Sequence, residues 1–510
     1  MTVLETTSAT YFPQSRGIVI RLSRDWNDDP PIRGVFTREA AMALSEALIR
    51  FKTKAFPYWN AVSMRHVNTS IIKVANERVL GTYDADEIRI NFPSEIGSGV
   101  GVNVSTNQLE QTMLERIVRE TIAMAPIYPK PSGPIPEDPS TQHYRPHTHL
   151  PVALWHDTTT RGFSSIRRTT IPTMLERART LQQTNGVNCV STVGVVAIAE
   201  LIRYEGGLTA WSQATDSELS VTARMPDNAG SGWSGAINRD WSRIVPGEVM
   251  DRAADIAVRT RGFVAYEPGR RTAILSAVAV GQLVRLLAPM FNADPTDGGQ
   301  TPFSLLKGGK RKNRLGMRVV DPRLTLQSDP ADPMGGFAPY LSEGLPGFPI
   351  TPMTWIERGI LQNLAYDTAY GTMRGKHWNE LPRSVHLTTA PGTATQTVDE
   401  MIASCEHGIY VNRLSDVALL DRTTGMSTGV TRDGCFLVRH GKIEKPIKNF
   451  RFLDSPIFAF NRLMSVGVPE RTPFGVKPSQ GAATDWPFPP VIAPPMMIAD
   501  FNFASMADAV

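Results

Sequence analysis

A proline-rich stretch constrains the fold of this chain more than any other segment. Eight prolines lie between Ala125 and Pro151 of the 510 residues, at positions 126, 129, 131, 134, 136, 139, 146 and 151. Proline lacks a backbone N–H and fixes φ, so this density excludes a continuous helix or a central strand. We predict a semi-rigid linker at 126–151, between an N-terminal α/β domain at 1–125 and a central mixed α/β region at 152–262. A C-terminal domain then occupies 263–510.

The N-terminal segment carries helical and strand-like patterns in turn. Apolar residues recur at helical spacing from Thr37 to Phe56. Strand-like runs follow at 61–67, 70–74, 87–92 and 99–104, separated by Gly, Asp or Asn. Ser105 and Gln108 then form a capping box before an apolar stripe, which predicts a helix that reaches Met124.

The central region mixes both types of element. Pro172–Thr184 predicts a helix and Leu219–Met225 a strand, whereas the Gly-, Ser- and Trp-rich run 230–241 is typical of a loop. Pro246 precedes apolar residues at helical spacing and predicts the start of another helix. In the strand-rich C-terminal third, Arg439–Lys442 predicts the tight turn of a hairpin.

Composition indicates an ordinary globular protein. The net charge of +4 is too small for a chain of this length to imply nucleic-acid binding. Three cysteines, Cys189, Cys405 and Cys435, cannot form a disulfide framework, and with no visible secretory signal they favour a cytoplasmic location. The longest apolar run, 187–202, is broken by polar residues and is interpreted as buried core rather than a membrane span.

Several residues could in principle act as a nucleophile or bind a metal ion, but a structural role is favoured for each. The sequence Gly-Trp-Ser-Gly at 232–235 lacks the full frame of a nucleophile elbow, and Cys189 lies in an apolar stretch typical of a buried, inert thiol. His143, His147 and His149 cluster near the end of the proline-rich stretch. Pro146 interrupts the first pair, while the second pair would share one face of a strand. A solvated linker is favoured, and a metal site stays open as an alternative.

The order of segments in the last half of the chain resembles a known family. The runs VAYEPGRRTAILSAVAVGQLVRLLAPMF, TPFSLLKGGKRKNRLGMRVVDPRLTLQSDP and GGFAPYLSEGLPGFPITPMTWIERGILQNLAYD, with a strand-rich end, resemble the C-terminal domain of the TldD/PmbA (TldD/TldE) peptidases. GVGVNVSTNQLEQTMLERIVRETIAMA resembles their N-terminal domain more loosely. The resemblance implies an α+β fold, with an N-terminal sheet-and-helix domain and a C-terminal, mainly antiparallel β domain.

The resemblance also implies a zinc site that this sequence lacks. Metal-bearing members carry HExxxH on the helix after the first strand of the C-terminal domain, but residues 281–288 here read GQLVRLLA. Such members take a further ligand from a cysteine near the C-terminus, and no cysteine follows Gly467. The chain therefore resembles the metal-free TldE/PmbA-type member. We expect no catalytic residue, no metal ligand and no cofactor of its own.

Two further positions match elements of the family. Ser342, Glu343 and Gly344 match an acidic-Glu-Gly element near the cavity that receives peptide, with serine in place of the usual first acidic residue. Alternatively, these residues form a structural turn. Lys310 and Arg311 belong to a basic run, 307–314, that is typical of a solvated surface loop. By position and charge, this loop is a candidate contact for a substrate carboxylate or a partner subunit.

Three functional hypotheses follow from the resemblance. In the first, the chain is a subunit of a peptide-cleaving metallopeptidase complex: it pairs with a zinc-bearing TldD-like chain, helps to enclose an unfolded peptide and leaves hydrolysis to its partner. In the second, it is a stand-alone peptide-binding or scaffold protein that pairs with itself as a homodimer. In the third, it is a peptidase with relocated catalytic groups at the histidine cluster. None involves nucleic acid or a membrane.

Overall fold

The computed structural model describes residues 35–50, 61–75, 78–92, 102–105, 146–204, 206–341, 347–377, 379, 381–473 and 490–507. The predicted helix that reaches Met124 and most of the proline-rich stretch lie outside these residues. Three sheets and a two-stranded hairpin account for the described strands, and nearly all pairings are antiparallel. The predicted α+β fold is thus confirmed.

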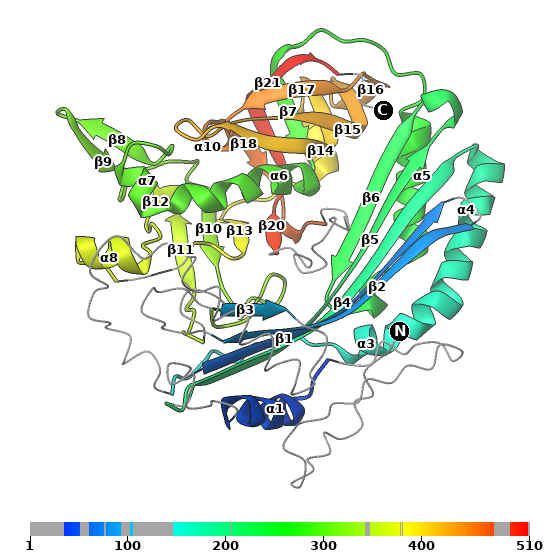
Figure 1. Ribbon diagram of the computed structural model, residues 1–510. Coiled ribbons are helices and arrows are strands. Elements are labelled where there is room, and N and C mark those ends of the chain that lie inside the picture. The colour runs from blue at the N-terminus through cyan, green and yellow to red at the C-terminus, as the bar shows by residue number, and fades with distance from the viewer. Residues whose placement is uncertain are drawn as a thin grey trace.

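A long twisted sheet forms the base of the molecule (Figure 1). Its six antiparallel strands follow the order β3-β2-β1-β4-β5-β6. Their bounds are β1 (Ala61–Ala75), β2 (Arg78–Phe92), β3 (Val102–Ser105), β4 (Asn188–Tyr204), β5 (Thr209–Arg224) and β6 (Ser231–Asn238). The apolar run predicted as buried core is β4, one of the two central strands of this sheet, and most of its residues are buried.

Four helices accompany this sheet: α1 (Arg38–Arg50), α3 (Asp157–Ser165), α4 (Ile171–Asn185) and α5 (Pro246–Arg259). The Thr37 hydroxyl accepts a 3.2 Å hydrogen bond from the Ala40 N–H and so caps α1. Helices α4 and α5 pack on β4 and β5 through one continuous apolar core. The C-terminal domain lies against the other face of the sheet, where Tyr340 packs on β4 and β5 residues (Figure 1).

The predicted boundary at 126–151 separates segments that share one sheet. Strand β1, from the predicted N-terminal domain, pairs with β4 from the central region at every residue from Ala61 to Ala75. The predicted strands at 61–67 and 70–74 are one continuous strand. Hydrogen bonding between strands does not depend on sequence proximity, so a proline-rich connection can link two neighbouring strands of one sheet without marking a domain boundary.

The predicted loop at 230–241 is also wrong, because residues 231–238 form β6. Its glycines allow helix α5 to approach the strand. A Cβ at Gly232 would lie 2.2 Å from the Ala253 carbonyl oxygen, and one at Gly230 would lie 2.4 Å from that of Ala257. Glycine here permits close packing rather than a turn.

Five strands of the C-terminal domain form a closed ring. They pair in the order β14-β7-β21-β17-β15, and the ring closes because the last strand, β15, also pairs with the first, β14. Phe450, Phe452, Phe501 and Phe503 fill its interior. The strands of this sheet are β7 (Gly269–Leu275), β14 (His407–Asp421), β15 (Met426–Arg439), β16 (Lys442–Pro446), β17 (Phe450–Asp454), β18 (Leu463–Val466) and β21 (Met496–Met506). The predicted hairpin is confirmed, with positive φ at His440 and Gly441 in the turn between β15 and β16.

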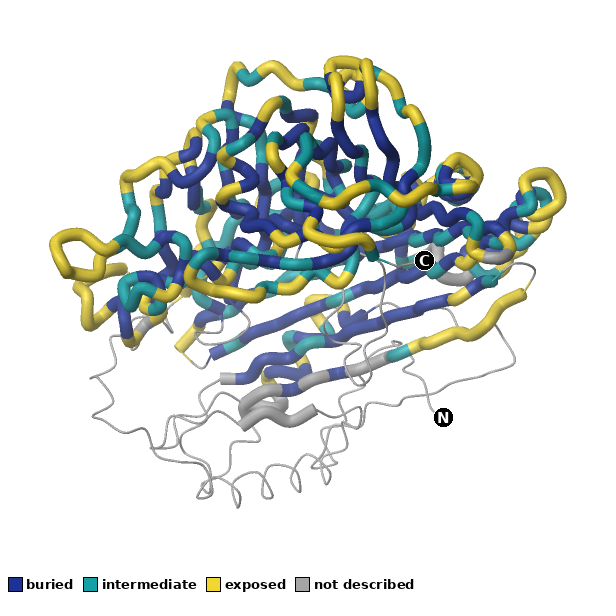
Figure 2. Tube along the Cα trace, turned by 90° about the horizontal axis from the view of Figure 1, so that it is seen from above, coloured by how far each residue is buried: buried dark blue, intermediate teal, exposed yellow. Residues whose placement is uncertain are grey.

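A second sheet of this domain has the order β12-β11-β10-β13-β20-β19. Its strands are β10 (Leu324–Ser328), β11 (Met353–Glu357), β12 (Ile360–Leu361), β13 (Val385–Thr389), β19 (Glu470–Arg471) and β20 (Val491–Ala493). The domain's helices are α6 (Ala277–Val284), α7 (Ala293–Asp297), α8 (Thr368–Arg374), α9 (Val398–Ser404) and α10 (Pro456–Asn461). Figure 2 shows the dark-blue core within this domain and where it meets the sheet, in contrast to the exposed end of β2.

Candidate functional site

Helix α6 occupies the place where the family resemblance predicts metal ligands. It begins at Ser276, whose hydroxyl accepts a 3.2 Å hydrogen bond from the Ala279 N–H. Its eight residues read AVAVGQLV and none has a metal-ligating side chain. The predicted helical segment 281–288 continues beyond α6 as a 3-10 helix, Arg285–Phe291.

Protein atoms fill the space beside Gly281 on this helix. A Cβ at Gly281 would lie 2.6 Å from Thr472 Oγ1 and 3.1 Å from Thr472 Cβ. The Thr472 hydroxyl donates a 3.1 Å hydrogen bond to the Val491 carbonyl, which fixes it against α6. A histidine at position 281 would require Thr472 to move. The residues around α6 therefore do not fit the zinc ion that the family resemblance implies.

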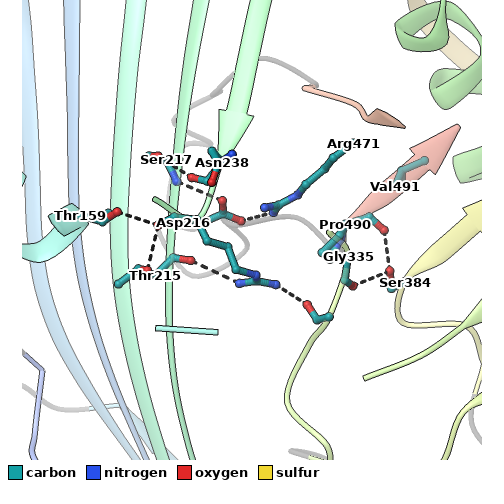
Figure 3. Close-up of polar contacts among 12 residues, drawn as sticks. Thr159, Thr215, Asp216, Ser217, Asn238, Gly335, Ser384, Arg471, Pro490 and Val491 are labelled. Atoms are coloured by element: carbon teal, nitrogen blue, oxygen red, sulfur yellow. Dashed lines mark hydrogen bonds and ion pairs between the residues drawn. The ribbon is translucent and has the colours of Figure 1, made fainter. Parts of the chain in front are cut away.

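The residue before Thr472 binds the large sheet. Arg471 forms an ion pair with Asp216 on β5, and the two side chains are 8% and 1% exposed (Figure 3). Nearby, Arg239 donates to the carbonyl of Gly336 in the C-terminal domain. Burial lowers the pKa of Arg239 to about 10, which keeps it charged at neutral pH. Residues 471 and 472 thus close the α6 face and hold the domain on the sheet at the same time.

A polar chain of Ser384, His386 and Asp332 lies beside this junction. The Ser384 hydroxyl contacts His386 Nε2, and His386 Nδ1 lies 3.5 Å from an Asp332 carboxylate oxygen. This order matches the Ser-His-Asp arrangement of hydrolases. However, Ser384 and His386 are 0% exposed, and Ser384 Oγ faces the backbone carbonyls of Gly335 and Pro490 at 3.0 and 2.9 Å (Figure 3).

Carbonyl oxygens accept hydrogen bonds and cannot stabilise an oxyanion. The chain of Ser384, His386 and Asp332 is therefore a structural connection between β13, the segment before β20 and the loop that contains Gly335. Burial opposes ionisation of Asp332, but the contact with His386 and the backbone N–H of Gly335 outweigh it and lower the pKa of the Asp332 carboxyl to about 2. Asp332 stays ionised at neutral pH.

An open cavity of about 570 Å³ lies beside β11, between this strand and residues 376–377, 379 and 381–383. We call it the β11 cavity. Such a volume is within the range of small-molecule sites, roughly 300–1,000 Å³. The apolar residues that line it are Leu315, Phe337, Phe348, Pro349, Ile350, Met353, Trp355, Leu364, Tyr366, Leu381 and Pro382. Three basic residues, Lys376, His377 and Arg383, also line it.

The polar groups of the cavity wall are largely engaged with the protein. Trp355 Nε1 donates to Ser328 Oγ at 3.0 Å. Asn363 Nδ2 donates to the Thr354 carbonyl at 2.7 Å. Asn379 accepts from the Tyr366 N–H and donates to the Leu364 carbonyl. The described wall is thus an apolar surface on which the side chains of Trp355, Asn363 and Asn379 bond to the protein, and Arg383 also interacts within the protein.

The residues proposed from the sequence lie in different places. Ser342, Glu343 and Gly344 lie outside the described residues, although their neighbours Leu341 and Phe348 are described and Phe348 lines the β11 cavity. Lys310 and Arg311 are exposed on β9 (Lys310–Asn313), which pairs with β8 (Ser304–Lys307). The basic run is thus a hairpin rather than a loop, and it protrudes from the molecule (Figure 1).

The remaining candidates have structural environments. His143 lies outside the described residues, whereas His147 packs edge-on against Phe348 and His149 Nε2 lies 2.8 Å from the Gly347 carbonyl. No group of three His, Cys, Asp or Glu that could hold a metal ion occurs among the described residues. Ser234 lies within strand β6, not at the strand-to-helix turn of a nucleophile elbow.

All three cysteines are free and buried. Burial raises the pKa of the Cys189 thiol to about 11 and that of Cys435 to about 12. A thiol that stays protonated at neutral pH is a poor nucleophile. The interpretation of Cys189 as an inert core residue agrees with this environment.

Sequence reasoning missed the cavity cations, the Ser384–His386–Asp332 chain and the Arg471–Asp216 pair. The last two residues are separated by 255 positions. No fixed spacing marks such contacts, so only the three-dimensional arrangement reveals them. The sole signal for the cavity was the resemblance of the neighbouring element at 342–344 to one near a peptide cavity.

Comparisons with known proteins agree with this architecture. Residues 268–505 match the model of the PmbA/TldA metallopeptidase C-terminal domain. TldE from Thermococcus kodakarensis has a TM-score of 0.70 at 14% identity, covering 90% of this chain and 99% of that one. A candidate modulator of a DNA gyrase from Thermotoga maritima has a TM-score of 0.67 at 17% identity, covering 91% and 99%. One from Bacteroides thetaiotaomicron has 0.67 at 16%, covering 91% and 100%.

No curated protein sequence matches the chain significantly. At these identities, the solved structures show a shared fold and nothing about activity. Together with the domain match, the fold defines a metallopeptidase-related protein. Residues 268–505 thus form a C-terminal domain of the PmbA/TldA type, and the chain shares the fold of TldE.

Among the described residues, no helix has the length and apolar character needed to cross a bilayer.

Proposed function

We propose that this chain is the peptide-binding, non-hydrolytic subunit of a metallopeptidase complex, and that it works with a zinc-bearing member of its own family. The observation that carries the proposal is the contrast within the C-terminal domain. Helix α6 lacks ligand side chains and is closed by Thr472, whereas the β11 cavity is open and large enough for a peptide segment.

The chemistry of α6 supports a role without hydrolysis. A catalytic zinc site uses about three protein ligands and keeps one position for water. Alanine, valine, leucine and glycine offer no donor atom in their side chains, and the one amide, Gln282, has no histidine or carboxylate beside it on the helix. The metal-activated water and its base would therefore belong to the partner subunit.

The cavity beside the second sheet supports a role in holding a peptide segment. Strand β12 pairs with β11 only at Ile356 and Glu357. The other half of β11 borders the β11 cavity through Met353 and Trp355. The Trp355 carbonyl accepts from the Gln362 N–H at 2.9 Å and the Thr354 carbonyl accepts from Asn363 Nδ2 at 2.7 Å. A peptide would therefore be held here chiefly by its side chains in the apolar cavity.

The test is recovery of the partner from the organism that produces the chain. The tagged full-length chain would be purified gently, and co-eluting proteins would be identified and quantified by mass spectrometry. We expect a second family member with HExxxH in equal amounts. A homo-oligomer free of such a protein would overturn the heteromeric proposal and favour the stand-alone binding protein. Stoichiometric metal in the chain purified alone would instead favour relocated catalytic groups.

A further inference from the structure

The β8–β9 hairpin carries a dense positive charge that the chain does not neutralise. Residues 298–320 contain no Asp or Glu. The exposed cations of the hairpin are Lys307, Lys310, Arg311 and Lys312. Within the described part of the chain, none of these four side chains has a hydrogen bond or an ion pair. Their charges are therefore available to an anionic partner.

The hairpin is fixed at its turn and at its base. Its turn residues Gly308 and Gly309 have φ of +59° and +71°, which fits the type I′ turn that two-residue hairpins favour. At the base, the Arg314 N–H donates to the Phe303 carbonyl at 2.9 Å, and Phe303 is fully buried. The cations are thus presented on an ordered element, so binding costs little additional backbone ordering.

Exposed apolar side chains lie on the hairpin and on two segments that meet its base. A Cβ at Gly425, in the turn between β14 and β15, would lie 3.0 Å from Pro302 Cγ and 3.1 Å from Ser455 Oγ, directly before α10. Strands β8 and β9 and helix α10 accordingly lie on one side of the domain (Figure 1). The apolar residues are Leu306, Leu420 and Phe458, which are 73%, 59% and 51% exposed. We call these three side chains and the four hairpin cations the hairpin surface.

This composition favours a protein partner over a nucleic acid. Phosphate groups would engage the cations but leave the three apolar side chains in water. The four hairpin cations equal the whole net charge of +4, so the rest of the chain has no excess positive charge to attract a polyanion. Protein interfaces, in contrast, combine an apolar centre with a polar and charged rim.

We propose that the hairpin surface is the docking site for the zinc-bearing partner subunit, which presents acidic side chains to the hairpin and an apolar patch to Leu306 and Phe458. This inference rests on the function proposed above and adds where the partner binds and what its surface must carry. Association of the unaltered chains should weaken as salt rises, because exposed charges are screened beyond about 10 Å at 0.1 M ionic strength.

The experiment measures association between full-length chains by surface plasmon resonance. The HExxxH-bearing relative from the same organism is immobilised, and the chain is passed over it at low and at moderate salt. Lys310→Glu with Arg311→Glu should weaken association at least about tenfold at low salt, mainly through a slower association rate. Lys442→Glu with Arg261→Glu reverses two exposed cations outside the hairpin surface, and we expect a change of no more than about twofold.

A second pair of variants tests the apolar part. Phe458→Ser should weaken association about tenfold at both salt concentrations, because apolar contact is not screened by ions. Val245→Ser is the matched control, since Val245 is also 51% exposed but precedes α5 on the large sheet. We expect this control to leave association unchanged.

The outcomes separate the two proposals. Partner association that is independent of salt and unchanged in both hairpin-surface variants would overturn the docking site and leave the heteromeric function intact. No association of the unaltered chain with the HExxxH-bearing relative would overturn the proposed function as well. Binding of a fluorescein-labelled DNA duplex that is lost on charge reversal, with partner association unchanged, would assign the hairpin to nucleic acid and overturn the docking site. The salt dependence needs no mutation, so it tests the proposal even if a variant does not fold.

Discussion

Helix α6 and the β11 cavity lie in one C-terminal domain, but protein atoms close the first while the second is open. Beside α6, Thr472 fills the space at Gly281 and Arg471 neutralises Asp216. In the cavity, the apolar wall remains accessible, and Lys376 and His377 are exposed at its border. Protein atoms thus fill the space in the first region, whereas the second presents an accessible apolar surface.

This difference teaches that one domain can keep an open cavity without the metal-ligating side chains expected on the helix in the same domain. A fold supports many activities, and the activity depends on particular side chains. Here the segment 470–472 acts on both sides: it packs on α6 and binds the large sheet. The closed region should therefore respond to mutation with a loss of stability, and the open region with a loss of binding.

The largest stability effect should come from Arg471→Ala. It leaves the carboxylate of Asp216, which is 1% exposed, without its charged partner, and removal of one member of a buried pair typically destabilises by about 3–5 kcal/mol. Chemical denaturation would measure it. Arg439→Ala is the matched control, because Arg439 and Glu444 pair at 3.2 Å with both side chains partly exposed, and we expect a loss below about 1 kcal/mol. Similar losses in both variants would show that the Arg471–Asp216 pair stabilises the fold no more than an exposed ion pair does.

The next effect concerns the space beside α6. Gly281→Ala places a Cβ 2.6 Å from Thr472 Oγ1, and we expect a loss of about 1–3 kcal/mol from overpacking. The double variant with Thr472→Ala should recover part of this loss, which a double-mutant cycle would reveal. Gly247→Ala is the control, since its Cβ meets no atom within 4 Å. A neutral Gly281→Ala would mean that the α6 face is not closed.

Asp332→Asn should lower the free energy of unfolding by a comparable amount, and this loss should depend on pH. The folded-state pKa is about 2 against an ordinary value of 3.8, so ionised Asp332 stabilises the fold by about 2 kcal/mol above pH 4. This contribution disappears as the pH falls from about 4 towards 2. The difference in melting temperature between the native chain and Asp332→Asn should shrink over that window. Asp255→Asn, in an exposed pair with Arg259, should show little difference at any pH, and a constant Asp332→Asn difference would argue against the predicted linkage.

The smallest stability effect should come from Lys310→Ala with Arg311→Ala. Both side chains are exposed on the β8–β9 hairpin, so the free energy of unfolding should change by less than about 0.5 kcal/mol. The hairpin protrudes (Figure 1), and we expect its charges to contribute to partner association. Assembly with the zinc-bearing subunit, measured by surface plasmon resonance, should weaken several-fold at low salt, while binding of an unstructured peptide to the chain stays the same. Unchanged assembly would show that the charges of the hairpin do not contribute to association with the partner.

Local sequence patterns predicted the local elements well. Pro246 and the apolar spacing behind it identified α5 (Pro246–Arg259), and the turn at 439–442 identified the β15–β16 hairpin. The glycines of 230–241 led to the wrong prediction of a loop, because their role depends on how closely α5 approaches β6. The pairing of β1 with β4 across the proline-rich stretch likewise depends on contacts that no local pattern encodes.

The site was less predictable than the fold. The absence of ligands on 281–288 could be read directly from the residues, but the packing of Thr472 on Gly281 could not. The cavity cations Lys376 and Arg383 belong to no motif, and their meaning depends on the apolar wall they border. Long-range contacts define both regions.

One measurement tests the central claim most directly. The purified chain, incubated with zinc and an unstructured, fluorescein-labelled peptide, would be assayed in the same sample for binding by fluorescence anisotropy and for cleavage by mass spectrometry. We predict that the peptide binds and stays intact, and that cleavage begins only when the zinc-bearing partner is added. Cleavage by the chain alone, abolished by a chelator, would contradict the account.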